Sequence, residues 1–470
     1  MNRPSIRGVC WRGGDYRIGW DQEREAEGSM IDAATEDRSH YETRREKTIL
    51  LILAAVQFTT IVDFMIVMPL GPQLMRTMHI NPAQFGVVVS AYTFAAGAMG
   101  LVASSIVDRY SRRSTFMVCY TGFLVGTLLC GLAPSYHSLV AARIATGAFG
   151  GLLGGMAMAI IGDVFPENRR GSATGSLMTG FALASIAGVP LGLYFGTKFG
   201  WHVPFVALAI GGIPSLAITP FALPALDAHV GKSHAHPIRS LVEIFSEVNH
   251  LNAFALIVML MIGSFAVFPM LSPYLVNNVG LKEEQLPWVY IAGGVLTLFT
   301  APIVGRLADR YGKLPVYCAI APGSAILMLV ITHFPPMPIQ LVVLVFGGLM
   351  MCNVGRMIAA MAMVTSSVEP RRRGAFLSVN SSVQHMASGI GAYFGGAIVT
   401  QAAGGRIEHF GTVGWFGAIC TLSTLWLATR VQIVDQAPVS AEAMSLAAAA
   451  EISVDAGEPM LSLNEFADRR

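Results

Sequence analysis

The sequence predicts an all-α membrane protein with twelve transmembrane helices, built by duplication of a six-helix unit. Of its 470 residues, 53% are apolar and only 13% are charged, about half of the roughly 25% charged residues of soluble domains. Apolar stretches of about 20 residues, the length that crosses a bilayer, recur along the chain. Two motifs also occur twice at nearly one spacing, which indicates the duplication.

Twelve apolar stretches, separated by links that are mostly short, mark the expected helices. They are residues 48–72, 83–106, 114–133, 138–161, 173–197, 203–223, 252–276, 286–308, 314–333, 338–363, 375–400 and 412–431. Short links imply antiparallel neighbours. The long link 224–251 divides the chain into halves, 48–223 and 252–431. The polar tails 1–47 and 432–470 lack a sustained apolar face, so both are expected to be disordered.

The distribution of basic residues orients the predicted helices, because cytoplasmic loops are enriched in Lys and Arg. Twelve basic residues lie in the central link and the loops after even-numbered spans: Arg109, Arg112, Arg113, Arg169, Arg170, Lys232, Arg239, Arg310, Lys313, Arg371, Arg372 and Arg373. The opposite loops hold four: Arg76, Lys198, Lys282 and Arg406. We therefore expect a multi-pass protein of the cytoplasmic (inner) membrane with both termini cytoplasmic.

Internal repeats relate the two halves. The sequence SSIVDRYSRR stands after the second span, and GRLADRYGK stands after the eighth. Asp309 thus lies 201 residues after Asp108. The tripeptide RRG at 169–171 recurs at 372–374, an offset of 203 residues, and Gly188 and Gly192 match Gly391 and Gly395 at that same offset. Two independent motifs at nearly one spacing predict a duplicated six-helix unit.

The repeated loop resembles the hallmark of the major facilitator superfamily, G-x-x-x-D-R-x-G-R/K. The second copy is intact at Gly305, Asp309, Arg310, Gly312 and Lys313, whereas serines 104 and 111 replace the usual glycines in the first copy. The resemblance covers residues 48–431. It implies two pseudo-symmetric six-helix bundles that rock about a central cavity.

Further motifs resemble the drug:proton antiporter and sugar-efflux branch of that superfamily. Arg143 with Gly147 in the fourth span, an acid in the middle of the first span, and the sequence GVPLG at 188–192 carry this likeness. The branch implies export. Pro190, between Gly188 and Gly192, removes a backbone donor and should bend the fifth span.

Asp63 is the predicted proton-coupling residue, because it is the only acid deep within an apolar span and desolvation makes such a charge costly. Arg143 is its expected partner. Counted at 1.5 Å per residue from the cytoplasmic edge, Asp63 lies about 22 Å deep and Arg143 about 27 Å, and the resemblance places their spans side by side. Thr59 and Thr60 are expected to hydrogen-bond Asp63. The alternatives are an acid that bridges helices and an arginine that anchors to outer headgroups.

A polar set in the second half is predicted to face the substrate cavity. Asn353 and Arg356 lie one turn apart, and Asn380 and Gln384 share one face of the eleventh span, with His385 adjacent. A fixed positive charge at Arg356 suits an anionic or hydroxyl-rich substrate; a salt bridge or carbonyl clamp is the alternative. His385 could be a second proton site, or a hydrogen-bonded core histidine.

Charged loops at the cytoplasmic mouth form the predicted gate. Their carboxylates can accept hydrogen bonds from a helix N-terminus across the bundle interface, and the resemblance implies a latch that holds the inward side shut; the alternative is a purely topogenic role. The gate residues are Asp108, Arg109, Arg112, Arg113, Asp309, Arg310 and Lys313.

The motifs favour a proton-coupled secondary exporter of a small molecule, and not an enzyme. The chain has no phosphate-binding GxxxxGK[ST] loop and no GxSxG or HExxH motif. We expect no cofactor, no metal and no nucleic acid, with protons, a small molecule and the bilayer as partners of a monomer. A proton-coupled uptake symporter for a sugar or organic acid is the nearest alternative, and a non-transporting sensor or assembly partner the next. Drugs, sugars and small acids remain open as substrates.

Overall fold

A computed structural model describes residues 45–106, 110–224, 237–369 and 372–433 of the chain. The predicted gate residues Asp108 and Arg109, most of both predicted tails and residues 225–236 of the predicted central link lie outside these described residues. Every structural statement below concerns the described part.

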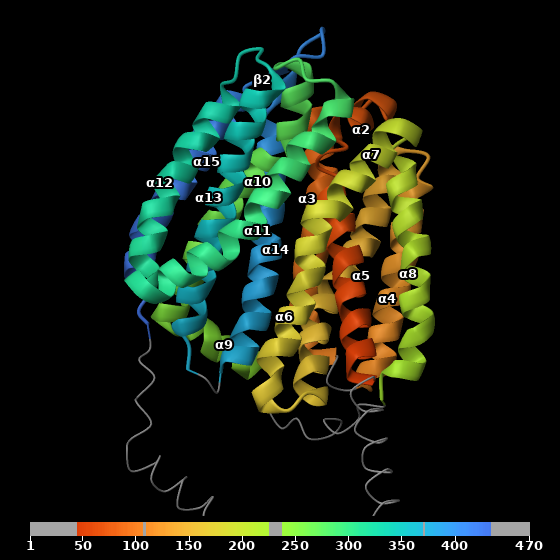
Figure 1. Ribbon diagram of the computed structural model, residues 1–470, viewed down its shortest axis with the longest axis vertical. Coiled ribbons are helices and arrows are strands. Elements are labelled where there is room, and N and C mark those ends of the chain that lie inside the picture. Colours follow the sequence, from red (N-terminus) through yellow and green to blue (C-terminus); the bar gives the residue numbers. More distant parts are fainter. Residues whose placement is uncertain (1–44, 107–109, 225–236, 370–371, 434–470) are drawn as a thin grey trace, which may run out of the picture.

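Helices form almost all of the described structure (Figure 1). The first helix is Arg45–Ile66. It is followed by α2 (Gly71–Thr77), α3 (Pro82–Ile106), α4 (Arg112–Gly131), α5 (Tyr136–Val164), α6 (Glu167–Leu183), the π-helical turn η2 (Ala184–Gly188), α7 (Val189–Phe199), α8 (His202–Ala222), α9 (Pro237–Ser246), α10 (Val248–Asn277), the 3₁₀ turn η3 (Glu283–Gln285), α11 (Leu286–Tyr311), α12 (Lys313–Thr332), α13 (Ile339–Ser366), α14 (Arg373–Ile398), strands β1 (Thr400–Gln401) and β2 (Ile407–Glu408), and α15 (Phe410–Arg430).

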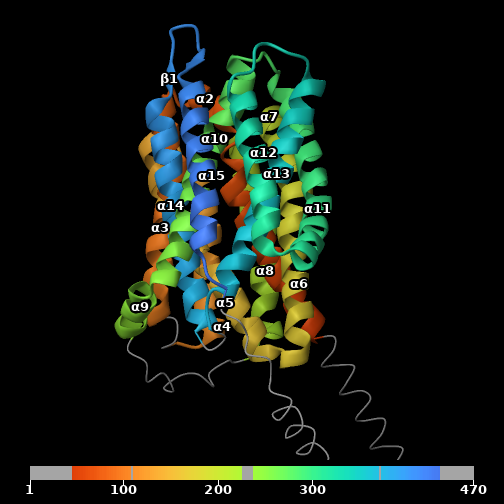
Figure 2. The same cartoon turned by 90° about the vertical axis from the view of Figure 1, so that its left-hand side faces the viewer.

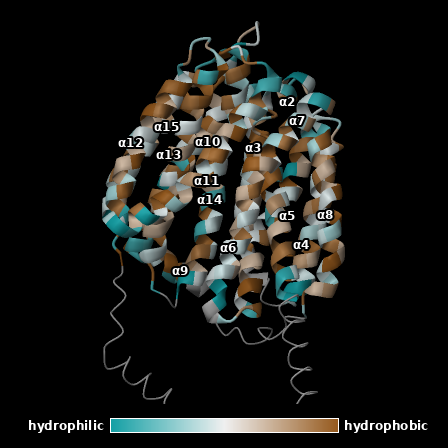
Figure 3. Ribbon diagram, viewed as in Figure 1, coloured by the Kyte–Doolittle hydropathy of each residue, from teal (hydrophilic) through white to brown (hydrophobic). Residues whose placement is uncertain are grey.

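The long helices run roughly parallel to one axis, with distinct elements at each end (Figures 1 and 2). We call the end with the antiparallel β1–β2 hairpin the hairpin end, and the opposite end the α9 end. Helices α3 to α8 gather on one side of Figure 1 and most of α10 to α15 on the other. Hydrophilic residues gather at the two ends and hydrophobic residues along the helices between them (Figure 3).

Eleven helices of the described chain are long and apolar enough to cross a membrane. Large apolar side chains such as Phe221, Leu344 and Trp288 are exposed on them, as expected for contact with lipid. The expected span at 375–400 corresponds to α14, which is not one of the eleven. Its 26 residues are sufficient in length, but Asn380, Gln384, His385 and several serines lower its hydropathy.

Proline positions account for two departures from the predicted spans. The first span was expected to continue to residue 72; the helix instead ends at Ile66, and a turn leads into the short α2. Pro69 cannot donate to the helical ladder, and Pro72 suits the first turn of a new helix. In the fifth span, Pro190 cannot donate to the carbonyl of Ile186, and the π-helical turn η2 lies immediately before it. The predicted distortion is thus a π-turn.

Two elements of the fold have no counterpart in the sequence prediction. Helix α9 occupies part of the stretch 224–251, which was expected to be a plain link, and α10 begins at Val248. Between α14 and α15, Thr400 pairs with Glu408 and Gln401 with Ile407 in a two-stranded hairpin. Strands of two residues give too short a pattern to be predicted.

The repeated glycines make equivalent contacts in the two halves. A Cβ on Gly188 would lie 2.3 Å from Val62 of the first helix, and one on Gly192 would lie 3.0 Å from Ile66. Their counterparts Gly391 and Gly395 lie against the backbone of α10, the first long helix of the second half, at the carbonyl groups of Ile262 and Ala266. Each half thus packs its glycine-bearing fifth helix against its own first helix, as small residues permit in membranes.

Helices α3 and α14 form a closely packed seam between the halves. A Cβ on Gly86 would lie 2.8 Å from the Ala392 carbonyl oxygen and 3.0 Å from the Cα of Gly396. Further along, Gly97 faces Met386 in the same way. We call this contact the α3–α14 seam. At Gly86 and Gly396 it leaves no room for a side chain, so the two backbones are in contact there.

Additional contacts join the halves at the hairpin end. Arg76 of α2 pairs with Glu283 of η3 through Nη1–Oε1 and Nη2–Oε2 distances of 2.5 and 3.2 Å. A Cβ on Gly71 would lie 2.9 Å from Pro273 of α10. Helix α11 packs against α7 and η2, the hairpin-end part of the fifth span, and Gly294 meets the Ser185 carbonyl there. The structure is closed between its halves at the hairpin end.

Gly86→Ala tests the α3–α14 seam. The added methyl group must displace the α14 backbone, and overpacking of this kind costs about 1–3 kcal/mol. We expect a lower midpoint of thermal unfolding in detergent. Gly211→Ala on α8, where an added Cβ meets nothing within 4 Å, is the matched control and should unfold with the wild type. Equal midpoints for the two variants would contradict the packing described.

Glu283→Gln tests whether the Arg76–Glu283 pair holds the hairpin end closed. Exposed ion pairs contribute about 0.2–1 kcal/mol, so its loss should shift the ratio of closed to open molecules about 1.5- to 5-fold. We expect spin labels at Thr77→Cys and Glu284→Cys to show a larger population at long distances by pulsed electron paramagnetic resonance. The charge swap Arg76→Glu with Glu283→Arg should reverse the shift.

The matched control for that experiment is the pair of Arg169 with Glu46, which joins two helices of the first half at the α9 end. Its Nη2–Oε2 distance is 2.6 Å, and its side-chain exposures of 54% and 20% resemble the 63% and 17% of Arg76 and Glu283. Glu46→Gln should leave the distance distribution unchanged. An equal shift in both variants would show that the effect is a general one of charge.

Candidate functional site

A buried ion pair lies in the first half of the protein. Asp63, one turn from the end of the first helix, accepts a hydrogen bond from Arg143 of α5, with Nη1–Oδ2 at 2.8 Å. Neither side chain has any exposed surface. Arg143 belongs to the second turn of α5, which starts at the hairpin end, so both residues lie toward that end. The structure thus places the two predicted proton-coupling residues in direct contact.

Two further helices complete the surroundings of this pair. The Thr127 hydroxyl of α4 donates to Asp63 Oδ1 at 3.1 Å. The Arg143 guanidinium lies 4.4 Å from the centre of the Tyr92 ring of α3, within the range of a cation–π contact. Phe64 stacks on Tyr92 at 5.3 Å between centroids and lies 5.8 Å from Phe265 of α10. Through Phe64, the pair is therefore in contact with the second half.

Arg143 depends on Asp63 for its charge compensation. Its Nε and Nη2 atoms are buried and have no hydrogen-bond partner in the described structure, and its Nη1 atom also lies 3.5 Å from the Asp63 carbonyl oxygen. Arginine stays protonated in proteins, whereas a carboxylate can take up a proton. Protonation of Asp63 would therefore leave a buried cation without its counter-ion, which is costly and favours rearrangement.

The threonines predicted to bind Asp63 do not do so. The hydroxyls of Thr59 and Thr60 donate to the Val56 carbonyl of their own helix, at 2.9 and 2.7 Å, as threonine often does within a helix. Thr127 takes the place expected for them. It is distant in sequence, and only the matching depth of its span could have indicated it. The alternative of Arg143 as a headgroup anchor is wrong, since its side chain is fully buried.

Arg356 lies in a separate polar network within the second half. It donates to the Asn353 amide oxygen at 2.8 Å, to Ser264 of α10 at 2.7 Å and to Thr421 of α15 at 2.7 Å. Its side chain is fully buried, so in this conformation it does not face a cavity as predicted. Within the described residues it forms no ion pair, and neutral oxygens satisfy it. Ser264 and Thr421, which the sequence prediction missed, lie on other helices.

The polar face of α14 packs largely inside the second half. The amides of Asn380 and Gln384 donate to the sulfur of Met361 on α13, at 3.8 and 3.6 Å. Asn380 is buried. His385 is half-buried and Ser381 is exposed. The Nδ1 atom of His385 lies 2.8 Å from the carbonyl oxygen of Ser381. His385 thus keeps some exposed surface, whereas Asn380 is buried.

The described gate residues make contacts at the α9 end. Arg112 Nε lies 2.6 Å from Asp163 Oδ2, which joins the start of α4 to the end of α5. Lys313 donates to the Ser366 hydroxyl at the end of α13. Arg113 is half-buried; Asp309 and Arg310 are exposed, and the Arg310 guanidinium lies 5.3 Å from the Tyr311 ring. Asp163, an acid at the end of a span, was missed by the sequence prediction.

Comparisons with known proteins agree on one family. The sequence profile of the Major Facilitator Superfamily matches residues 53–264 and again 253–454, so the two matches fall on the two halves of the chain. Two relatives in Bacillus subtilis (strain 168), the uncharacterized MFS-type transporters YbcL and YceJ, are 25% and 23% identical. The alignments cover 78% and 79% of this chain and 93% of each relative.

Solved structures of transporters share the fold. The nucleoside transporter NupG and a D-xylose–proton symporter both align with a TM-score of 0.66, at 13% and 15% identity, over 82% of this chain and 99% and 98% of theirs. An inward-facing, unoccupied bacterial homolog of the human lysosomal transporter Spinster gives 0.61 at 15% identity, over 82% of this chain and 95% of its own.

Substitutions at the buried pair should differ in cost. Asp63→Asn leaves Arg143 as an uncompensated buried cation, and loss of one partner of such a pair costs about 3–5 kcal/mol. Arg143→Gln should cost less, because Asp63 can take up a proton and become neutral. The double variant should be more stable than Asp63→Asn alone. Thermal unfolding in detergent measures all three, and an Arg143→Gln variant less stable than Asp63→Asn would contradict the account.

Proposed function

Because the chain belongs to the Major Facilitator Superfamily, we propose that it is a proton-coupled secondary transporter that exports a small molecule by alternating access. Asp63 carries the proton and Arg143 is its partner. The superfamily consists of transporters, and the closed packing between the halves at the hairpin end is one of the two arrangements that alternating access requires.

The observation that carries this proposal is the buried Asp63–Arg143 pair. An ionised pair in the membrane interior is stable only while both charges remain. A proton on Asp63 removes one of them, so proton uptake becomes coupled to a change in the contacts of Arg143. Those contacts include Tyr92 and, through Phe64, Phe265 of the second half. A local protonation is thereby connected to the interface between the halves.

We orient the protein in the membrane by the distribution of its basic residues. With the α9 end cytoplasmic, twelve spans place both termini inside, and α14 counts as the twelfth span because it packs against α3 and α10 within the bundle. The hairpin end then faces outward, and this conformation is closed on the outer side. The gate loops with Arg112, Asp309 and Lys313 lie at the inner mouth. We place the protein in the cytoplasmic membrane of a bacterium-like cell, as a monomer.

The export direction rests on the sequence GVPLG at 188–192, which resembles a motif of the drug:proton antiporter and sugar-efflux branch. Proton-coupled uptake is the second candidate, and its support is the structural likeness to a D-xylose–proton symporter. A non-transporting sensor or assembly partner is the third; it would leave the buried pair without a role. His385, which keeps some exposed surface, is a candidate for substrate contact or a second proton site.

Proton flux from inside-out vesicles tests the function and its direction together. On addition of a transported compound, wild-type vesicles acidified inside should release protons, and Asp63→Asn vesicles should release none. Glu46→Gln, which removes an acid at the α9 end that pairs with Arg169 within the first half, is the matched control and should retain coupled flux. Compound movement that needs no proton gradient and is unaffected in Asp63→Asn would contradict proton coupling, while proton-driven movement into the cell would replace export by uptake.

A further inference from the structure

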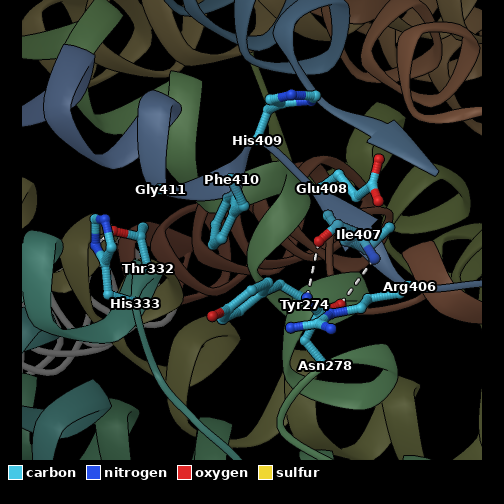
Figure 4. A pocket seen from close by; sticks show the side chains of 10 residues that line it. All are labelled: Tyr274, Asn278, Thr332, His333, Arg406, Ile407, Glu408, His409, Phe410 and Gly411. Atoms are coloured by element: carbon cyan, nitrogen blue, oxygen red, sulfur yellow. Dashed lines mark hydrogen bonds between the residues drawn. The ribbon is translucent and has the colours of Figure 1, made fainter. Parts of the chain in front are cut away.

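A cavity of about 370 Å³ opens at the hairpin end of the second half (Figure 4). The ends of α10 and α12, strand β2 and the start of α15 bound it. Neither residue of the Asp63–Arg143 pair and none of the glycines in the α3–α14 seam lines it. The cavity is therefore separate from the proposed proton-coupling site.

Hydrogen bonds and ring contacts fix the walls of this cavity. The Asn278 amide donates to the Ile407 carbonyl, and the Ile407 N–H donates to the Asn278 amide oxygen, both at 2.8 Å. These two bonds hold β2 against α10. Tyr274 donates to the Phe334 carbonyl at 2.9 Å, and its ring lies 4.7 Å from that of Phe410. The aromatic wall and the strand are thus positioned before any ligand binds, which lowers the cost of binding.

Arg406 and His333 line the cavity together with this aromatic wall. Arg406 is exposed and forms no ion pair within the described residues, and in Figure 4 its side chain extends toward Asn278 and Tyr274. His333 has its Nδ1 2.8 Å from the Leu329 carbonyl, which leaves Nε2 on the side of Gly411. A Cβ at Gly411 would lie only 2.6 Å from that nitrogen, so the imidazole fits in this position only because residue 411 is glycine.

The start of α15 and the direction of the Glu408 side chain both favour a negatively charged ligand beside the aromatic rings. Helix α15 begins at its edge without a side-chain cap, so the positive end of the helix dipole faces the cavity region. Glu408 is the single acid among the lining residues, and in Figure 4 its carboxylate points away from the Tyr274 and Phe410 rings.

We propose that this cavity binds a small organic carboxylate. Arg406 forms a bidentate pair with the carboxylate, for which the guanidinium geometry is suited. The His333 imidazole adds a polar contact, and the positive end of the α15 dipole adds favourable charge. The rings of Tyr274 and Phe410 contact the apolar body of the ligand. The site lies at the end opposite α9, so a ligand reaches it without entering the space between the two halves.

Binding of benzoate to the full-length protein in detergent, measured by isothermal titration calorimetry, tests the proposal. We expect saturable binding that Arg406→Gln weakens about tenfold or more, the usual effect of losing a charged hydrogen bond. Gly411→Ala, which pushes His333 aside, should also weaken it. Lys198→Gln removes a cation at the same end but outside the cavity and is the matched control; it should bind like the wild type. Thermal unfolding confirms that each variant is folded.

Several results would overturn this assignment. One is wild-type protein without saturable benzoate binding, and another is Arg406→Gln with unchanged affinity. Inorganic phosphate binding as tightly as benzoate would show a general anion site in place of a carboxylate site. Loss of benzoate binding in Asp63→Asn, with Arg406→Gln unaffected, would place the ligand at the central pair.

Discussion

The interaction on which the rest of this structure depends is a single ion pair inside an apolar bundle. Asp63 and Arg143 are both removed from water, and each is tolerated there because of the other. Four helices of the first half supply the pair and its neighbours Thr127 and Tyr92. A carboxylate can accept a proton and an arginine does not release one, so we propose that this pair acts as a switch. Phe64 connects it to Phe265 of α10.

The second half shows how the same fold accommodates a buried arginine without a counter-ion. Arg356 is surrounded by an amide oxygen and two hydroxyls, which hold three helices together. It has no group in its hydrogen-bonded shell that could titrate, so it fixes its half, whereas the pair in the first half can change. The repeated glycine contacts show that the two halves have equivalent packing. Their polar interiors differ: the first half holds a buried ion pair, and the second a buried arginine bonded to neutral oxygens.

Much of the architecture could be predicted because it follows from local composition. Span length and the repeated glycines are properties of single segments, and the expectations for an all-α membrane fold and for the superfamily are confirmed. Asp63 stands out because an acid in an apolar span is costly. Contacts made by neutral side chains across helices could not be predicted in this way. Thr127 and Ser264 are ordinary residues in their own spans, and only the three-dimensional packing gives them charged partners.

The short elements show the same limit. A two-residue strand and a π-turn have no periodicity by which a sequence could predict them. The hairpin before α15 is held by the hydrogen bonds between Asn278 and Ile407. The π-turn η2 lies where Pro190 removes a backbone donor. The hairpin nevertheless shapes the cavity around Arg406. Hydropathy patterns do not show features of this kind.

The central claim is that Asp63 changes its protonation state as the halves rearrange. Infrared difference spectroscopy on the protein in lipid, recorded between high and low pH, tests it most directly. The account predicts a protonated carboxyl band that appears on acidification, disappears in Asp63→Asn, and accompanies a change in the distance between labels on α2 and η3. A band that is identical in Asp63→Asn, or a distance change that occurs without it, would contradict the account.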